Sequence, residues 1–339
     1  MPELPAIGLR LHGGLDPGEC IELADIAEAN GFASIWFAEN PFQRGVMPAA
    51  SACAWMTRRL RIGLGIVNVY GHHPTLIAME FAALDELAEG RAVLGIGSGI
   101  GRLIEQMGFA WQPLASIRDA FHILRGLLAG EEVSHRGRVF SVEKARLGFR
   151  PLRADPPIYV AAMGDRSLEL CGSLADGLIV SNLCPPLYTE RAVAILRRAA
   201  VEAGQPPPAV VQYVPCIPSS DRDEARRTAM THIGEMMAAF WPAASEWPPL
   251  RETIVERSGI PRATFAAALQ RIRAGTPPGQ ALDDRFVEAF AICGTAEECL
   301  SRAADYRRAG VDELVLSFSG ADALDQIEYL GAALGKAGG

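Results

Sequence analysis

The chain alternates short apolar runs with longer amphipathic stretches, and this rhythm constrains its fold more than any other feature. Strand–helix alternation implies parallel strands, because a helix supplies each crossover. We expect strands at Ala6–His12, Ala33–Glu39, Arg61–Val69, Arg91–Gly97, Pro157–Ala162, Gly177–Asn182, Ala209–Ile217 and Asp312–Phe318. Eight such units favour an α/β fold of the (β/α)8 TIM-barrel type over a doubly wound open sheet.

The amphipathic stretches between these runs carry apolar residues at helical spacing. We expect helices at Pro17–Asn30, Pro48–Arg58, Pro74–Glu89, Ile117–Ala129, Ser167–Ala175, Tyr188–Ala203, Arg222–Ala239, Thr295–Ala309 and Ala321–Leu334. Gly31 stands where a helix C-cap is expected, and Thr295 is a suitable N-cap. The segment Val133–Val142 predicts a small hairpin that turns at Arg136 and Gly137.

Residues 240–290 break the rhythm and are rich in Pro and Trp. We interpret them as a helical insertion or lid within one barrel domain that spans 1–339. The length of 339 residues suits either two domains or one large barrel, and 49% apolar residues exclude intrinsic disorder.

Charge and cysteine usage narrow the function classes. The formal net charge is −8 and no long basic run exists, which argues against nucleic acid as a partner. Seven cysteines without a CxxC pair predict a reduced, cytoplasmic compartment. The N-terminus lacks the apolar core of a signal peptide. The longest uncharged run, Ile62–Met79, contains Asn68 and two histidines, so we expect no membrane span.

Two loops that follow predicted strands carry distinctive residues. Gly95–Gly101 is dense in glycine but fails the GxGxxG pattern, so it predicts a strand end where a flat ligand approaches the backbone, or only a tight turn. Gly65–Pro74 places Asn68, Tyr70, His72 and His73 at and beyond a strand end, where barrels build their active sites. Adjacent histidines rarely share one metal, so we predict no metal site. One histidine capping the following helix is the alternative to a site role.

Two further strand ends offer chemistry. Glu39 and Asn40 close an apolar run, and Glu39 is a candidate acid–base group or substrate anchor. Its alternative role is an ion pair with a neighbouring arginine. In the segment Ala161–Ser167, Gly164 precedes a predicted helix start, whose free backbone N–H groups bind phosphate. The alternative there is that Ser167 only caps the helix. No GxSxG motif supports a nucleophilic triad.

Four segments together resemble the bacterial luciferase-like superfamily of flavin and deazaflavin enzymes, over nearly the whole chain. They are ELADIAEANGFASIWFAEN, LGIVNVYGHHPTLIAMEFAALDELAEGRAVLGIGSG, PIYVAAMGDRSLELCGSLADGLIVSN and FAICGTAEECLSRAADYRRAGVDELVLS. The second is the most specific. It is similar to the branch that uses coenzyme F420, which includes methylenetetrahydromethanopterin reductase and a glucose-6-phosphate dehydrogenase.

The resemblance implies a cofactor pocket at the carboxyl ends of the strands. It implies a cis peptide at Gly65–Ile66, followed by Asn68, and a ring pocket lined around Gly97 and Ser98. Gly164, Asp165 and Ser167 would form the phosphate-binding turn, and Asn182 would lie near the ring. Further cofactor-binding residues in the same segment are Ala162, Met163 and Arg166. Asn40 would bind the cofactor beside Glu39, and Glu39 or His73 would give or take a substrate proton.

The resemblance implies an F420-dependent oxidoreductase that passes a hydride to or from a small organic substrate. Relatives often carry Asp-His where this chain has Glu39-Asn40. The sugar-phosphate branch carries a Glu where this chain has Ile100, which argues against a sugar phosphate. An FMN-dependent monooxygenase and a cofactor-binding barrel without turnover remain open as alternatives.

The resemblance also implies a homodimer. The helices at 47–58 and 74–89 carry more apolar residues than one buried stripe needs. We expect the two-fold interface on this side. Its candidate residues are Trp55, Met56, Leu76, Ile77, Met79 and Phe81.

Overall fold

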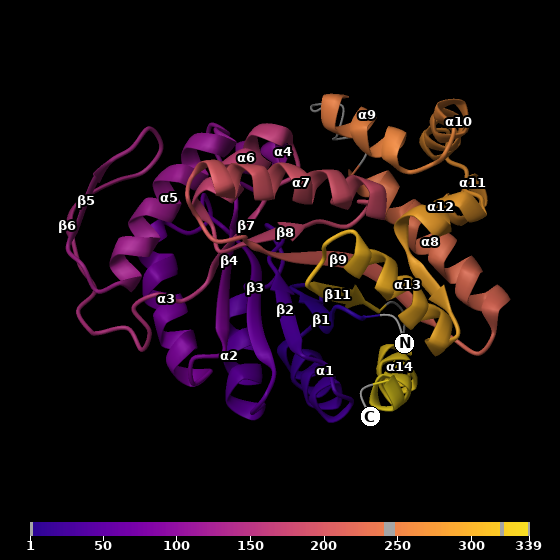
Figure 1. The fold of residues 1–339 in the computed structure, drawn as a ribbon, viewed down its shortest axis with the longest axis horizontal. Helices are drawn as coiled ribbons and strands as arrows, with labels where there is room; N and C mark the ends of the chain where they lie inside the picture. Colours follow the sequence, from indigo (N-terminus) through magenta and orange to yellow (C-terminus); the bar gives the residue numbers. More distant parts are fainter. Residues whose placement is uncertain (1–2, 241–247, 319–321, 338–339) are drawn as a thin grey trace.

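The computed structural model describes residues 3–240, 248–318 and 322–337, and these form a closed parallel barrel surrounded by helices (Figure 1). The barrel strands, in order around the wall, are β1 (Ala6–His12), β2 (Ser34–Ala38), β3 (Arg61–Asn68), β4 (Ala92–Gly97), β7 (Ile158–Ala161), β8 (Gly177–Val180), β9 (Ala209–Pro218) and β11 (Glu313–Ser317). Parallel pairing of β11 with β1 closes the wall, from Ala6 opposite Glu313 to Leu9 opposite Leu316. The predicted (β/α)8 barrel is confirmed.

Helices connect successive strands as the spacing predicts. They are α1 (Pro17–Ala29), α2 (Val46–Met56), α3 (Pro74–Leu87), α5 (Pro113–Leu128), α6 (Asp165–Leu174), α7 (Pro186–Glu202), α8 (Arg222–Phe240), α13 (Ala296–Arg308) and α14 (Ala323–Ala337). Two short elements were not predicted: α4 (Gly101–Gln106) and β10 (Ile292–Gly294), which pairs with β9. Six and three residues are too few to show a periodic pattern.

Local capping signals are confirmed where they were clearest. Gly31 follows α1 with φ at 78°, a backbone conformation that favours glycine. Thr295 caps α13: its hydroxyl accepts from the Glu298 N–H, and the Glu298 carboxylate accepts from the Thr295 N–H. The predicted hairpin is also present, as antiparallel β5 (Val133–Arg136) and β6 (Ser141–Ala145).

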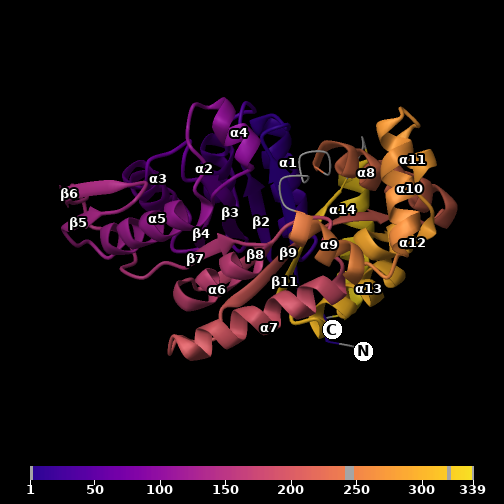
Figure 2. The same cartoon turned by 90° about the horizontal axis from the view of Figure 1, so that it is seen from above.

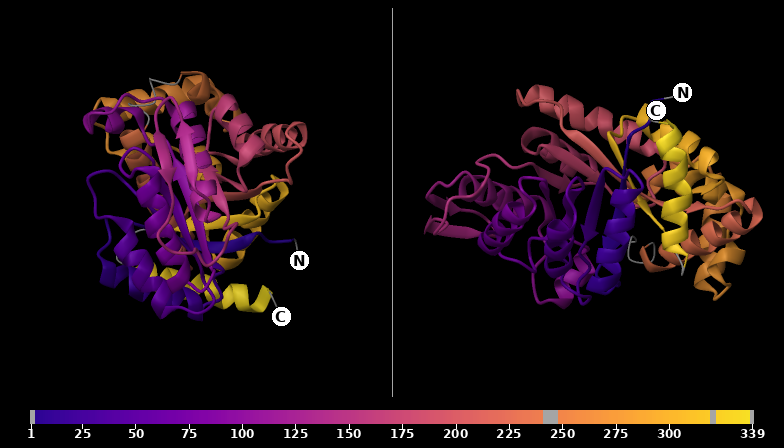
Figure 3. Two further views of the ribbon diagram at one scale, coloured as in Figure 1. Left: turned by 90° about the vertical axis from the view of Figure 1, so that its left-hand side faces the viewer. Right: turned by 90° about the horizontal axis from the view of Figure 1, so that it is seen from below.

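The β5–β6 hairpin and the helices after β9 lie at opposite ends of the molecule's long axis (Figures 1 and 2). The second group comprises α9 (Pro248–Arg257), α10 (Arg262–Arg273), α11 (Pro278–Ala281) and α12 (Asp284–Phe290). It falls within the predicted 240–290 insertion, of which 241–247 lie outside the described residues. At the edge of the barrel, α14 packs beside α1, so the last helix contacts the first (Figure 3).

Aromatic side chains fill the barrel interior. Trp36 and Tyr159 are buried there with ring centroids 5.9 Å apart, and Tyr213 belongs to the same buried cluster. The Trp36 ring fits because its partner on the neighbouring strand β3 is glycine: a Cβ on Gly63 would lie 2.2 Å from a Trp36 ring carbon. The interior is therefore a packed core that supports the strand ends above it.

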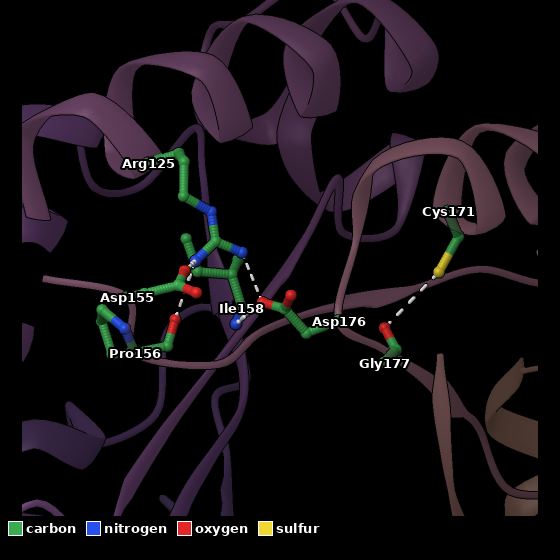
Figure 4. Close-up of polar contacts among 7 residues, drawn as sticks. All are labelled: Arg125, Asp155, Pro156, Ile158, Cys171, Asp176 and Gly177. Atoms are coloured by element: carbon green, nitrogen blue, oxygen red, sulfur yellow. Dashed lines mark hydrogen bonds and ion pairs between the residues drawn. The ribbon is translucent and has the colours of Figure 1, made fainter. Parts of the chain in front are cut away.

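Polar groups at the amino ends of the strands bond one another. The Glu313 carboxylate, 3% exposed, accepts from Trp36 Nε1 at 2.8 Å and from Arg61 at 2.7 Å, and the Ser34 hydroxyl also donates to it. At the same end, the Arg125 guanidinium lies between Asp155 and Asp176 (Figure 4).

Helices α2 and α3 expose several large apolar side chains. They are Trp55, at 63% exposure, Met56, Leu76, Met79 and Leu87. Ile77 and Phe81, which we predicted for an interface, are instead fully buried in the core, because they lie on the faces of α3 that contact the barrel and its neighbouring helices. Among the described residues, no helix is long and apolar enough to cross a membrane.

Candidate functional site

A cavity of about 670 Å³ opens at the carboxyl ends of the strands. This volume is within the usual range for small-molecule sites. Its apolar wall includes Ile66, Val160 and Ile179. The predicted site residues that line it are Ile66, Gly97, Ser98, Ala162, Met163, Gly164, Asp165, Arg166 and Ser167. Segments 66, 97–98 and 162–167, distant in sequence, thus share one cavity.

The wall at Ile66 is an irregular stretch of β3. The Gly65–Ile66 peptide bond is cis, as expected, and the pairing of β3 with β4 shifts register between Leu64 and Val67. The Tyr213 hydroxyl donates to the Gly65 carbonyl at 2.8 Å from the opposite side of the barrel. On the neighbouring strand β4, a Cβ on Gly97 would lie 2.8 Å from Ile66 Cδ1, so a side chain at position 97 would require the Ile66 side chain to move.

The opposite end of the cavity is suited to an anion. Helix α6 begins there with Gly164 as its N-cap, and the first-turn N–H groups of a helix lack partners within the helix. The Ser167 hydroxyl donates to the Gly164 carbonyl at 2.7 Å. Ser167 is therefore inside the helix rather than its cap, so the capping interpretation of Ser167 was wrong. Arg166 is exposed beside the cavity and forms no ion pair with any described residue.

Asp165 stands in this turn, but its charge is balanced. Arg191 on α7 also lines the cavity and pairs with Asp165 through two parallel bonds of 2.7 and 2.8 Å. These bonds from Arg191 hold the pKa of the Asp165 carboxyl below its ordinary value. Sequence reasoning missed Arg191, because 26 positions separate the partners and no motif links them.

Glu39 joins two strand ends. Its Oε1 lies 2.7 Å from His72 Nε2, and its Oε2 accepts from the Asn68 backbone N–H at 2.8 Å. The Asn68 side chain in turn accepts from the Tyr70 N–H at 2.8 Å and shapes the loop that carries His72. The partner of Glu39 is thus a histidine rather than the neighbouring arginine weighed above.

The Glu39 contact changes the proton chemistry of His72. The hydrogen bond with Glu39 raises the pKa of His72, and this outweighs burial, which would lower it. The protonated ring is stabilised, so the pair can hold a proton between a carboxylate and an imidazole. The sequence had placed His72 in the right loop without distinguishing it from His73.

His73 has a different position. It is the N-cap of α3, and its Nδ1 accepts from the Thr75 N–H at 3.3 Å. This matches the helix-capping alternative. Asn40 donates to the Gln43 side chain at 3.2 Å. The predicted site residues that lie outside the lining of the main cavity are Glu39, Asn40, Gly65, Asn68, His73 and Asn182, and His72 also lies outside it.

Asn182 follows β8, and its Oδ1 is buried without a hydrogen-bond partner among the described residues. An orphaned buried acceptor near the strand ends is the kind of group that a bound ligand satisfies. Within the cavity, an apolar wall without a side chain at Gly97 and a helix start with unpaired N–H groups fit an elongated group with a flat ring and a phosphate.

Similarity to known proteins extends over most of the chain. The family described as luciferase-like monooxygenase matches residues 4–313. A 5,10-methylenetetrahydromethanopterin reductase of Methanolobus tindarius is 31% identical over 86% of this chain and 87% of its own length. An F420-dependent glucose-6-phosphate dehydrogenase of Nakamurella multipartita is 32% identical over 56% of this chain and 60% of its own. The structure of a coenzyme F420 dependent tetrahydromethanopterin reductase from Methanopyrus kandleri superposes with a TM-score of 0.85, at 24% identity, over 97% of this chain and 98% of that one.

Proposed function

Because this chain belongs to the luciferase-like monooxygenase family, we propose that it is an oxidoreductase that transfers a hydride between coenzyme F420 and a small organic substrate. The F420-dependent relatives support this choice of cofactor. FMN is the competing cofactor, since the family takes its description from monooxygenases.

One observation carries the proposal: a single cavity joins the bulged, apolar end of β3 to the first turn of α6. Ile66, Gly97 and Ser98 would hold the flat ring of the cofactor. The first-turn N–H groups of α6, with Arg166, would hold its phosphate. Asp165 does not oppose this role, because Arg191 already neutralises its charge.

When bound, a deazaflavin supplies the hydride donor or acceptor, and the protein supplies position and electrostatics. Ile66 would set the face on which the ring lies, and Gly97 would admit the ring against the backbone. The apolar wall of Val160 and Ile179 would exclude water from the ring edge. Glu39 would hold the His72 ring, and His72 would give or take the proton that accompanies hydride transfer at the substrate.

Titration of the purified protein with F420 and with FMN tests the cofactor. We expect saturable F420 binding, and a substrate-dependent loss or gain of the oxidised deazaflavin absorbance. Arg166→Ala should weaken F420 binding roughly 10-fold, because it removes one charged donor to the phosphate. Arg198→Ala is the matched control, since Arg198 contacts its carboxylates only at 3.7 and 3.9 Å on the exposed side of α7.

Three outcomes separate the alternatives. FMN binding with oxygen consumption would replace this proposal with a monooxygenase. Tight F420 binding without turnover across a substrate panel would indicate a binding protein. Equal F420 affinity in wild type and Arg166→Ala would contradict the placement of the cofactor phosphate at the first turn of α6.

We propose that the substrate is not a sugar phosphate. Ile100 lines the cavity where the sugar-phosphate branch is expected to carry a glutamate. Leu250 and Thr253 of α9 line the same cavity, so the 240–290 segment would act as a lid that shapes the substrate side. Truncated or chimeric versions of this segment should alter substrate choice more than F420 affinity.

We also propose a homodimer through the exposed face of α2 and α3. Trp55, Met56 and Met79 are the most exposed of the large apolar side chains on these two helices. A monomer does not normally expose such a group of large apolar side chains together. Light scattering should show a dimer at micromolar concentration, and Trp55→Glu with Met79→Glu should give a monomer. A monomeric wild type would contradict this interface.

A further inference from the structure

The interior of the barrel mouth contains an arginine that the proposed cofactor site does not use. Residues Ile7, Leu9 and Leu11 of β1 pack outward into the main core, so the alternate residues face the barrel axis. Arg10 is one of these. Its Cζ lies 5.6 Å from the centroid of the Tyr213 ring, over the face of that ring.

Within the described part of the chain, Arg10 lacks the partners that a buried guanidinium normally has. Its Nε is inaccessible and has no hydrogen-bond partner among the described residues, although the residue as a whole is only half-buried. Among residues 3–240, 248–318 and 322–337, no carboxylate forms an ion pair with it. Burial lowers the pKa of Arg10, with Tyr213 opposing this. A charge in such surroundings is unfavourable unless a counter-charge joins it.

A second unpartnered group lies beside it. Leu9 of β1 pairs with Leu316 of β11, so the next residues along the two parallel strands are Arg10 and Ser317. The Ser317 hydroxyl is buried and also has no hydrogen-bond partner among the described residues. Two adjacent strands thus present free donors toward the same space. Neither donor has a hydrogen-bond partner among the described residues.

The net charge of Arg10 and the groups around it indicates which charge a ligand at this place would carry. Burial and then the Arg10 charge lower the pKa of His12, and Glu19 opposes them. Burial also lowers the pKa of His232, where Glu235 opposes and Arg10 adds to the effect. Both rings therefore favour the neutral form, and Arg10 remains the one positive charge among these groups. A single guanidinium matches a monoanion better than a phosphate dianion.

We propose that Arg10 and the Ser317 hydroxyl bind a carboxylate group of the substrate. The planar guanidinium fork offers two parallel N–H donors to the two oxygens of a carboxylate, and the hydroxyl offers a third. Tyr213 contacts Arg10 by its ring and the Gly65 carbonyl by its hydroxyl, and the next residue, Ile66, lines the cofactor cavity. That the bound carboxylate belongs to a substrate rests on the proposed function. The carboxylate site itself does not depend on that function.

Acetate and its neutral analogue acetamide are the probes. In the full-length protein, the Arg10 Nε–H resonance is assigned by its loss in Arg10→Met. We expect acetate to shift this resonance saturably and to raise Tm, and acetamide to do neither. Arg10→Met should weaken acetate binding roughly 30-fold or more, since a desolvated charged partner is lost. Arg10→Lys should recover only part of it, because lysine lacks the fork.

Two further variants sharpen the test. Ser317→Ala should weaken acetate binding roughly 5-fold, as expected for one hydrogen bond to a charged group. Arg58→Met is the control for general effects of charge, since Arg58 is exposed on the surface, and it should leave acetate binding unchanged. Without acetate, Arg10→Met should show a higher Tm than wild type, because an unpaired buried charge is removed.

The outcomes separate this inference from the proposed function. Failure of acetate to bind saturably, equal binding to Arg10→Met, or a lower Tm of apo Arg10→Met would overturn the carboxylate site. If F420 alone shifts the Arg10 resonance and loses affinity in Arg10→Met, the anion belongs to the cofactor and the substrate assignment is wrong. If acetate binds at Arg10 while F420 does not bind, the carboxylate site stands and the cofactor proposal fails.

Discussion

The two ends of the barrel treat buried polar groups in opposite ways. At the amino ends of the strands, Glu313 bonds Ser34, Trp36 and Arg61, and Asp85 receives two bonds from Arg153 at 2.6 and 2.8 Å. Even Arg91, whose Nε lacks a partner, donates through its other nitrogens to three backbone carbonyls.

At the carboxyl ends, several buried polar atoms have no partner among the described residues. They are Arg10 Nε, Gln112 Oε1, Asn182 Oδ1 and Ser317 Oγ. The polar pairs found there, Glu39 with His72 and Asp165 with Arg191, position groups beside the cavity. The difference indicates that the amino end provides stability and the carboxyl end keeps groups available for ligands, at some cost in stability.

The largest expected effect is at the amino end. Glu313→Ala removes the acceptor of the buried Ser34 hydroxyl, leaves the Trp36 N–H only its 3.0 Å bond to Ser34 Oγ, and removes the Arg61 ion pair. We expect a loss of about 3–5 kcal/mol in the free energy of unfolding. Urea unfolding measures it, with the exposed Glu132→Ala as control. A loss as small as that of Glu132→Ala would mean that the amino end does not have this stabilising role.

The next effect concerns Arg125, which bridges two carboxylates and the Pro156 carbonyl (Figure 4). Its partners Asp155 and Asp176 are 84% and 43% exposed, so solvent screens the pairs. Arg125→Ala should cost about 1–2 kcal/mol, because two like charges are left facing each other. Added salt should reduce this loss. Arg198→Ala, whose contacts are longer, should cost close to nothing in the same unfolding assay.

At the carboxyl end, removal of a buried polar group should raise the free energy of unfolding instead of lowering it. Ser317→Ala removes a buried hydroxyl that has no partner, so the free energy of unfolding should rise by about 1 kcal/mol. The matched control is Ser116→Ala on α5. Ser116 is fully buried, and its hydroxyl donates to the Pro113 carbonyl at 3.1 Å. That variant should lose about 1 kcal/mol. Equal losses in both variants would erase the contrast between paired and unpaired hydroxyls.

The smallest effect is the pH dependence from His72. Glu39 raises the pKa of His72 in the folded protein. The resulting stabilisation is fully present below the pKa of an unfolded histidine and is lost as the pH rises through the raised folded value. NMR titration of the His72 ring should show a pKa above that of an unfolded histidine, and Glu39→Gln should lower it. An unchanged His72 pKa in Glu39→Gln would show that the two side chains are not in contact in solution.

The sequence predicted the barrel well because its signals were local and repeated. Each strand run and each helix period lies within ten to twenty residues, and caps such as Gly31 and Thr295 mark the helix ends. The cis bond at Gly65–Ile66 was also expected, from the family resemblance rather than from the residues alone.

The site was less predictable, because its contacts depend on how distant elements meet. No spacing rule connects Asp165 with Arg191, or Glu39 with His72 in preference to His73. Arg10 looked like an ordinary residue of an N-terminal segment until the alternation of β1 placed it inside the barrel. Arg10 occupies an inward position of β1. A polar residue on the interior face of a strand is the sequence signal that could have identified it.

The contact between Glu39 and His72 also restricts how the family can vary. One carboxylate accepts from the Asn68 N–H and bonds the His72 ring. Loss of Glu39 alone would leave a backbone donor and an imidazole without an acceptor. Replacement of His72 alone by an acidic residue would place two carboxylates together. Evolution is therefore expected to change positions 39 and 72 as a pair, with an acidic residue at 39 accompanied by a basic one at 72.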